Sequence, residues 1–81
     1  MMHKNVCNAV ARLLEEKERN LTLHEMFHNT TYTNGRLMKY SRMGPLNISA
    51  LHNIIMNDKE RRFVKMPDPK GGPSLYSLKE D

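Results

Sequence analysis

Residues 47–78 read NISALHNIIMNDKERRFVKMPDPKGGPSLYSL, and this run carries the strongest structural signals in the chain. Its first part has apolar residues at helical spacing, namely Ile48, Leu51, Ile54 and Ile55. Two short runs of strand-forming residues follow, at 61–66 and 74–78, separated by a loop rich in proline and glycine. The run therefore predicts a helix, capped by Asn47, that leads into a two-stranded β-hairpin.

Apolar and polar residues alternate imperfectly along the two expected strands, as in a small sheet with one buried face. We expect Phe63 and Leu75 to contact the core, with Leu78 as a further candidate. The loop at 67–72 is long for a two-strand turn, and it would carry Lys70 into solvent.

Two more helices are predicted before this run. The first is amphipathic and covers residues 3–17. The second follows Thr22, whose hydroxyl can cap the next turn while Glu25 reaches back in a capping box, and it would end near His28. Residues 36–43 are either a further short helix or a loop docked on the core. The expected fold class is α+β, with three helices, or four, followed by a β-hairpin.

Length and composition narrow the function. The chain has 81 residues, one cysteine and a formal net charge of +4. This length predicts one domain over residues 1–81. A domain of this size buries only about 60% of the surface that its unfolded chain exposes, which leaves little interior for a deep catalytic cleft. We therefore expect no enzymatic activity and no cofactor. The lone Cys7 indicates a reducing compartment. No apolar run approaches the roughly 20 residues that span a bilayer. These features predict a cytoplasmic (nucleoid) or nuclear protein without a membrane partner.

The charges are unevenly distributed along the chain. Residues 26–57 contain no acidic residue, and their cations are Arg36, Lys39 and Arg42. A stretch without acids lowers the cost of approaching a polyanion. The alternative is an ordinary solvated surface that happens to lack acids.

The helix predicted at 47–57 has a polar face that could read DNA bases. Ser49, His52 and Asn53 point away from its apolar side, and asparagine pairs characteristically with adenine in the major groove. The alternative is an ordinary polar helix face. If the helix reads bases, we expect the phosphate contacts to come from five cations: Arg36, Lys39, Arg42, Lys65 and Lys70. This hypothesis requires the polar row and the cations to lie on one side of the molecule.

A zinc-peptidase pattern is also present. His24–His28 read H-E-M-F-H, which resembles the H-E-x-x-H motif of the zincin metallopeptidases. Thr31 and Asn34 stand where the longer metzincin pattern needs glycine and a third histidine. A capping box already accounts for Glu25, so we predict no metal ligands. Zinc binding by His24 and His28 is only a third hypothesis.

The order of helices and hairpin resembles the winged helix-turn-helix superfamily. Arg62-Phe63-Val64-Lys65 and Tyr76-Ser77-Leu78 are similar to the wing strands of HARE-HTH modules from chromatin and bacterial transcription proteins. The resemblance implies a small winged helix with a role in nucleic-acid binding or regulation and no catalysis. The main hypothesis is a double-stranded DNA-binding transcription regulator or architectural protein. The helix at 47–57 would enter the major groove, and the wing at 61–78 would contact the backbone.

A protein-binding role is the alternative. The same helix, or the apolar segment at 37–43, could hold a component of the transcription machinery in a small adaptor or inhibitor, whose length would also suit a viral protein. An apolar face left exposed in that segment would favour this alternative. The sequence does not specify whether the protein dimerises.

Overall fold

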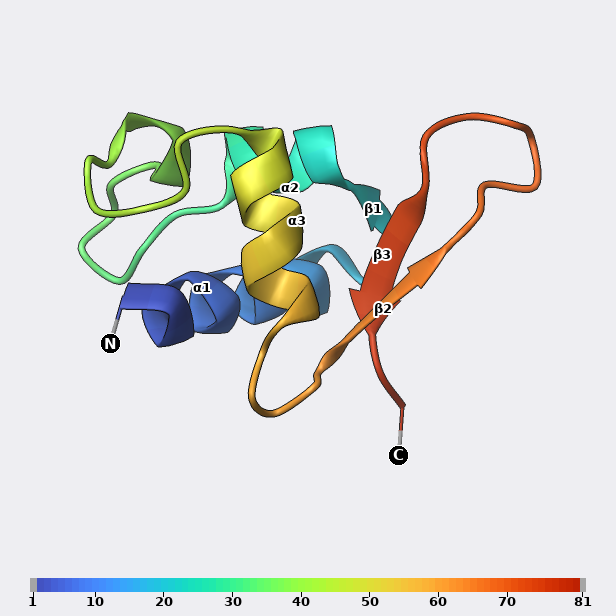
Figure 1. The fold of residues 1–81 in the computed structure, drawn as a ribbon, viewed down its shortest axis with the longest axis horizontal. Coiled ribbons are helices and arrows are strands. Elements are labelled where there is room, and N and C mark those ends of the chain that lie inside the picture. Colours follow the sequence, from blue (N-terminus) through green and yellow to red (C-terminus); the bar gives the residue numbers. More distant parts are fainter. Residues whose placement is uncertain (1, 81) are drawn as a thin grey trace.

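The computed structural model describes residues 2–80, which form a small mixed α+β domain (Figure 1). The helices are α1 (Met2–Lys17), α2 (Leu23–Asn29), the short 3₁₀ helix η1 (Met38–Tyr40) and α3 (Ile48–Met56). The strands are β1 (Leu21–Thr22), β2 (Phe63–Met66) and β3 (Leu75–Leu78). The predicted helix at 47–57 is confirmed, and the Asn47 side chain accepts a hydrogen bond from the Ala50 amide at 2.8 Å.

The strands form an antiparallel sheet in the order β1-β3-β2. The two predicted strands pair as β2 and β3, but the sheet has a further strand that was not predicted. β1 adds a third strand, because Leu21 pairs with Tyr76 and Thr22 with Leu75. A two-residue strand has no periodicity of its own, and its partner lies more than 50 residues away along the chain, so no local pattern indicates it.

The hairpin register determines which residues of β3 enter the core. Phe63 is opposite Leu78 and Lys65 is opposite Tyr76, and residues directly opposite one another share a face of the sheet. Tyr76 is 1% exposed and Phe63 is 6% exposed, while Leu78 packs against the core from a half-buried position. The prediction that Leu75 contacts the core is therefore wrong, since Leu75 lies on the opposite face and Tyr76 takes its place.

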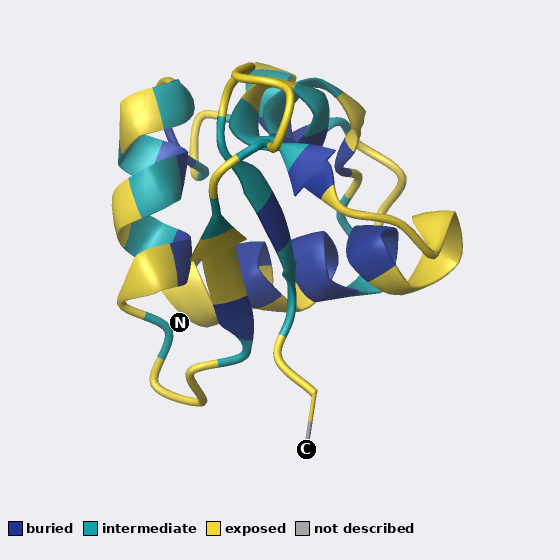
Figure 2. Ribbon diagram, turned by 90° about the vertical axis from the view of Figure 1, so that its right-hand side faces the viewer, coloured by how far each residue is buried: buried dark blue, intermediate teal, exposed yellow. Residues whose placement is uncertain are grey.

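A single hydrophobic core joins all the elements. α1 contributes the largest share, and each other element adds one or two large residues, among them Leu21, Met26, Met38 and Leu51. In Figure 2 the buried residues, in dark blue, lie along α1, α3 and the strands, and the hairpin loop is largely exposed.

The connection between α2 and α3, residues 30–47, is mostly irregular. The helix considered for 36–43 is limited to η1, because the backbone is already extended at Leu37 and again at Ser41. A bridge between Thr31 and Leu37 and a hydrogen bond from the Met38 amide to the Thr30 carbonyl fold the connection back on itself. In Figure 1 the connection and the hairpin loop lie at opposite ends of the long axis.

Candidate functional site

A cleft of about 600 Å³ lies between α3, the start of α2 and the hairpin. We call it the α3 cleft. Its lining comes from three parts of the chain and includes Thr22, Leu23, His24, Ile48, Ser49, His52, Asn53, Lys65, Pro73, Ser74 and Tyr76. None of these side chains is acidic, so nothing in the lining repels an anion.

The cleft brings together part of the site predicted from the sequence. Leu51 and Ile55 are buried on the inner side of α3, which turns Ser49, His52 and Asn53 toward the cleft. Ser49 and Asn53 are exposed, whereas His52 is half-buried. Lys65 reaches the same cleft from β2, because its register position opposite Tyr76 puts it on the helix-facing side of the sheet.

Tyr76 is a member of this site that the sequence reasoning missed. Its hydroxyl oxygen lies 2.9 Å from Nδ1 of His52, and the two rings meet edge to face at 6.1 Å between centroids. Burial raises the pKa of the Tyr76 hydroxyl, which therefore stays protonated at neutral pH. Its hydrogen bond holds the imidazole of His52 in place. The two residues are 24 positions apart, and only the packing of α3 on β3 makes them neighbours.

The hairpin loop extends beyond the cleft. Lys70 is exposed in this loop and does not line the cleft, although it belongs to the same hairpin as Lys65. The loop has local structure, because the Asp68 side chain accepts a hydrogen bond from the Lys70 amide at 3.0 Å. Gly71 has φ of +81° and donates its amide to the Asp68 carbonyl at 2.9 Å, which closes the turn.

The other three predicted cations do not join the cleft. Arg36 lines a separate hollow against α1, together with Arg12 and Tyr32. Lys39 lies beside α2, with Nζ 3.4 Å from Nδ1 of His28. Arg42 is exposed in the connection. The requirement for one continuous cationic side is thus not met, because the connection folds back toward α1 at the end of the molecule away from the hairpin loop (Figure 1).

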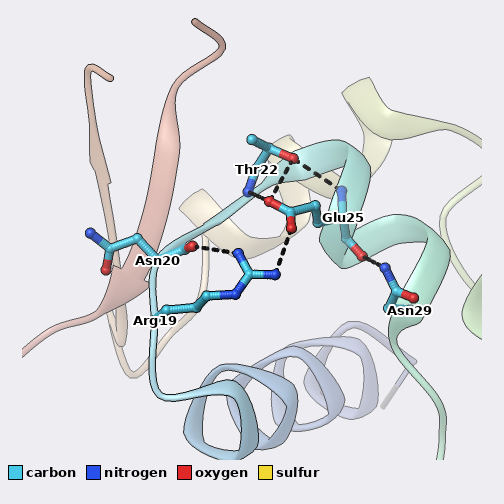
Figure 3. Close-up of polar contacts among 5 residues, drawn as sticks. All are labelled: Arg19, Asn20, Thr22, Glu25 and Asn29. Carbon is cyan, nitrogen blue, oxygen red and sulfur yellow. Dashed lines mark hydrogen bonds and ion pairs between the residues drawn. The ribbon is translucent and has the colours of Figure 1, made fainter. Parts of the chain in front are cut away.

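The capping box predicted at the start of α2 is confirmed (Figure 3). The Glu25 amide donates to Oγ1 of Thr22 at 3.1 Å, and the Thr22 amide donates to Oε1 of Glu25 at 3.1 Å. Nη2 of Arg19 contacts the other carboxylate oxygen at 2.8 Å. These partners, with the Arg19 hydrogen bond first, lower the pKa of Glu25. Both of its carboxylate oxygens therefore have partners within the protein, so the capping box and the Arg19 ion pair account for Glu25.

His24 and His28 stack on α2 with their ring centroids 4.3 Å apart. Burial, followed by the proximity of His24 and Lys39, lowers the pKa of His28. Over residues 2–80, no three or more His, Cys, Asp or Glu side chains gather where they could hold a metal ion. The arrangement therefore gives the two imidazoles no third protein ligand.

Cys7 has no features of a nucleophile. Its side chain is 2% exposed, and burial, with Asp58 as a smaller cause, raises the pKa of its thiol to about 11. The thiolate that would be needed for covalent chemistry is thus scarce at neutral pH.

Comparisons with protein families, characterised proteins and solved structures gave no match to this chain. Within residues 2–80, no helix combines the length and apolar character needed to cross a membrane.

Proposed function

We propose that the chain is a winged-helix domain that binds double-stranded DNA through α3 and the β2–β3 hairpin, with Lys65 and Lys70 as the phosphate contacts in place of the five cations expected from the sequence. The observation that supports this proposal most is the α3 cleft, where Ser49, His52, Asn53 and Lys65 meet in a lining that contains no acidic side chain. A polar helix face beside a cationic strand suits a ligand that offers base edges next to a row of phosphates.

The dimensions of α3 fit this ligand. An α-helix with its side chains is about 10–12 Å across, and the major groove of B-DNA is about 12 Å wide. With α3 in the groove, the phosphate strand that borders the groove would run along the cleft toward the hairpin. Asn53 is suited to a bidentate contact with adenine, while Lys65 and Lys70 are suited to phosphates.

The connection between α2 and α3 departs from the usual helix-turn-helix, in which a turn of about three or four residues joins the two helices. Here residues 30–47 intervene, yet α2 and α3 still pack against each other. The inserted length lies to one side and leaves the outer face of α3 uncovered, since Ser49 and Asn53 remain exposed. A long connection is therefore compatible with a base-reading role for α3.

The salt dependence of DNA binding tests the proposal. Two phosphate contacts, from Lys65 and Lys70, should give a log–log slope of affinity against salt of about −2, whereas five contacts would give about −4 to −5. Fluorescence anisotropy with a random 16-base-pair duplex across salt concentrations measures the slope. The Lys65→Ala/Lys70→Ala variant should lose most of it.

The matched control is Arg36→Ala/Arg42→Ala, which removes the same charge from the other end of the molecule and should keep the slope near −2. A slope near zero for the unaltered chain would refute DNA binding. A slope lost only in the Arg36→Ala/Arg42→Ala variant would move the polyanion surface away from the cleft.

A further inference from the structure

The connection carries the most exposed large apolar side chains among the described residues. Leu46 is 84% exposed, Tyr40 is 70% exposed and Met43 is 64% exposed. The next most exposed, Met56 and Val64, reach only 37%. We call these three residues, together with Arg36, Lys39 and Arg42, the connection patch. Its apolar members lie within seven positions along the chain, and Met43 lines the same hollow as Arg36.

The backbone holds the connection patch in an ordered arrangement. Met38 and Pro45 are buried and fasten the connection on both sides of Met43. The amides of Tyr40 and Ser41 donate to the carbonyls of Leu37 and Met38 at 3.1 and 3.0 Å. Folding has thus already ordered the backbone of this surface, so less conformational entropy is lost when a partner binds.

The charge on the connection patch is of one sign. Arg36 and Arg42 are exposed, and Nζ of Lys39 lies 5.2 Å from the ring centroid of Tyr40. Residues 26–57 contain no acid that could neutralise these cations from within the segment. A complementary partner must therefore offer carboxylates and apolar side chains together.

We propose that the connection patch binds an acidic amphipathic segment of a partner protein. Tyrosine, methionine and arginine are the residue types enriched at protein–protein interfaces, and all three occur in the patch. This proposal goes beyond the DNA-binding proposal, because it concerns a second surface with a different ligand.

The composition of the patch favours a protein over an anionic membrane. Recognition of anionic lipids is typical of clusters of about four to eight Lys and Arg, and interfacial anchors usually carry Trp or Phe. The patch has three cations and neither of those aromatic residues. It also has only one aromatic residue, Tyr40, on which a nucleic-acid base could stack.

A peptide titration tests the proposal. The probe is a fluorescent 16-residue peptide that alternates Glu or Asp with Leu or Phe, and its control is the same peptide with Lys in place of every acid. We expect the acidic peptide to bind and to shift amide resonances of residues 36–46 in two-dimensional NMR spectra, while the basic peptide does not bind. Arg36→Glu/Arg42→Glu and Met43→Ser/Leu46→Ser should each lower the affinity at least tenfold. All four positions are exposed, so both variants should fold, which circular dichroism checks.

The matched control is Lys65→Ala/Lys70→Ala, which should lose DNA affinity and keep peptide affinity. Failure of DNA binding and failure of peptide binding are therefore seen separately. The proposal is overturned if the acidic peptide causes no shift at millimolar concentration, or if both peptides bind equally. It is also overturned if phosphatidylserine vesicles bind in preference to the peptide, or if sedimentation shows a dimer that the Met43→Ser/Leu46→Ser variant no longer forms.

Discussion

At the residue scale, the polar contacts in the turn after α3 link distant parts of the chain. The Asp58 side chain is 5% exposed and accepts hydrogen bonds from the amide and from Nε of Arg62, at 3.1 and 2.9 Å. Nη1 of Arg62 donates a hydrogen bond to Oδ1 of Asn8 on α1 at 2.9 Å. One carboxylate thus fixes the turn into β2 and orients the arginine that ties this turn to α1.

These contacts predict how stability depends on pH. The hydrogen bond from Arg62 is the largest cause that lowers the pKa of Asp58 in the folded state. The contribution of ionised Asp58 to the free energy of unfolding is therefore complete above its unfolded pKa of about 4. It is lost as pH falls through the lower pKa of the folded state. Asp58→Asn should cost about 1–2 kcal/mol at pH 7, and this difference should shrink at pH 2.5. Urea unfolding at the two pH values measures it.

The control for this experiment is Glu15→Gln, which removes an exposed carboxylate of α1 and should change little at either pH. Glu25 also has a lowered pKa, so the unaltered chain loses stability in acid for two reasons. The difference between Asp58→Asn and the unaltered chain isolates the part of this loss that comes from Asp58. A cost that stays the same between pH 7 and pH 2.5 would contradict the role given to the Asp58 charge.

At the element scale, local signals set the helices and distant contacts set the sheet. Thr22 and Glu25 cap α2, and Asn47 caps α3, through hydrogen bonds that reach only three residues along the chain. Signals this short can be read from sequence, which explains why both caps and the end of α2 within one residue of His28 were predicted correctly. The strand β1 and the place of Tyr76 in the core depend instead on partners across the sheet.

The connection depends on one close approach. A Cβ atom on Gly44 would collide with the hydroxyl oxygen of Tyr32, whose ring packs against the core. Gly44→Ala should therefore force the connection or the ring to move and should cost about 1–3 kcal/mol. Thermal unfolding followed by circular dichroism measures the loss.

A double variant tests the cause of that loss. Tyr32→Phe removes the oxygen that the new Cβ would meet, and the nearest ring carbon stays at an ordinary contact distance of 3.5 Å. Gly44→Ala/Tyr32→Phe should therefore recover most of the stability lost by Gly44→Ala alone. Equal losses in the single and double variants would show that the hydroxyl contact is not the reason for glycine at this position.

At the scale of the whole molecule, one core holds together elements that carry two distinct surfaces. The described chain has a radius of gyration of 11.8 Å and extents of 34 × 26 × 22 Å. The α3 cleft faces the hairpin, and the connection patch lies on the segment at the other end of the long axis (Figure 1). A domain with this layout could hold a nucleic acid and an acidic protein segment on separate surfaces.

The shared core predicts cooperative unfolding. Because α1, α2, α3, η1 and all three strands contribute to one cluster, no element has a core of its own. Urea transitions followed by far-ultraviolet circular dichroism, which reports helices, and by the NMR signals of Tyr76 in β3 should share one midpoint. Amides of the exposed hairpin loop should exchange hydrogen much faster than those of α1 and β3. A separate, earlier transition of the hairpin would contradict a single core.

The candidate site was only partly readable from the sequence. Ser49, His52 and Asn53 were identified because helical spacing fixes which side of α3 is apolar, and Lys65 joins them in the cleft. The expectation that Arg36, Lys39 and Arg42 share that surface failed, because the direction of an irregular connection depends on contacts such as the bridge from Thr31 to Leu37. Tyr76 was missed because its contact with His52 exists only after α3 has packed on β3.

The sequence alone determined α1, α2 and α3, the caps of α2 and α3, and the hairpin strands. The helices and caps depend on interactions among residues a few positions apart, and the two strands pair across one short loop. Only the tertiary structure decided three further features: the third strand, the separation of the cations into two groups, and the exposure of Tyr40, Met43 and Leu46. The physical reason is that these features depend on contacts between segments far apart in the chain, whose geometry is set by the packing of the core and not by local conformational preference.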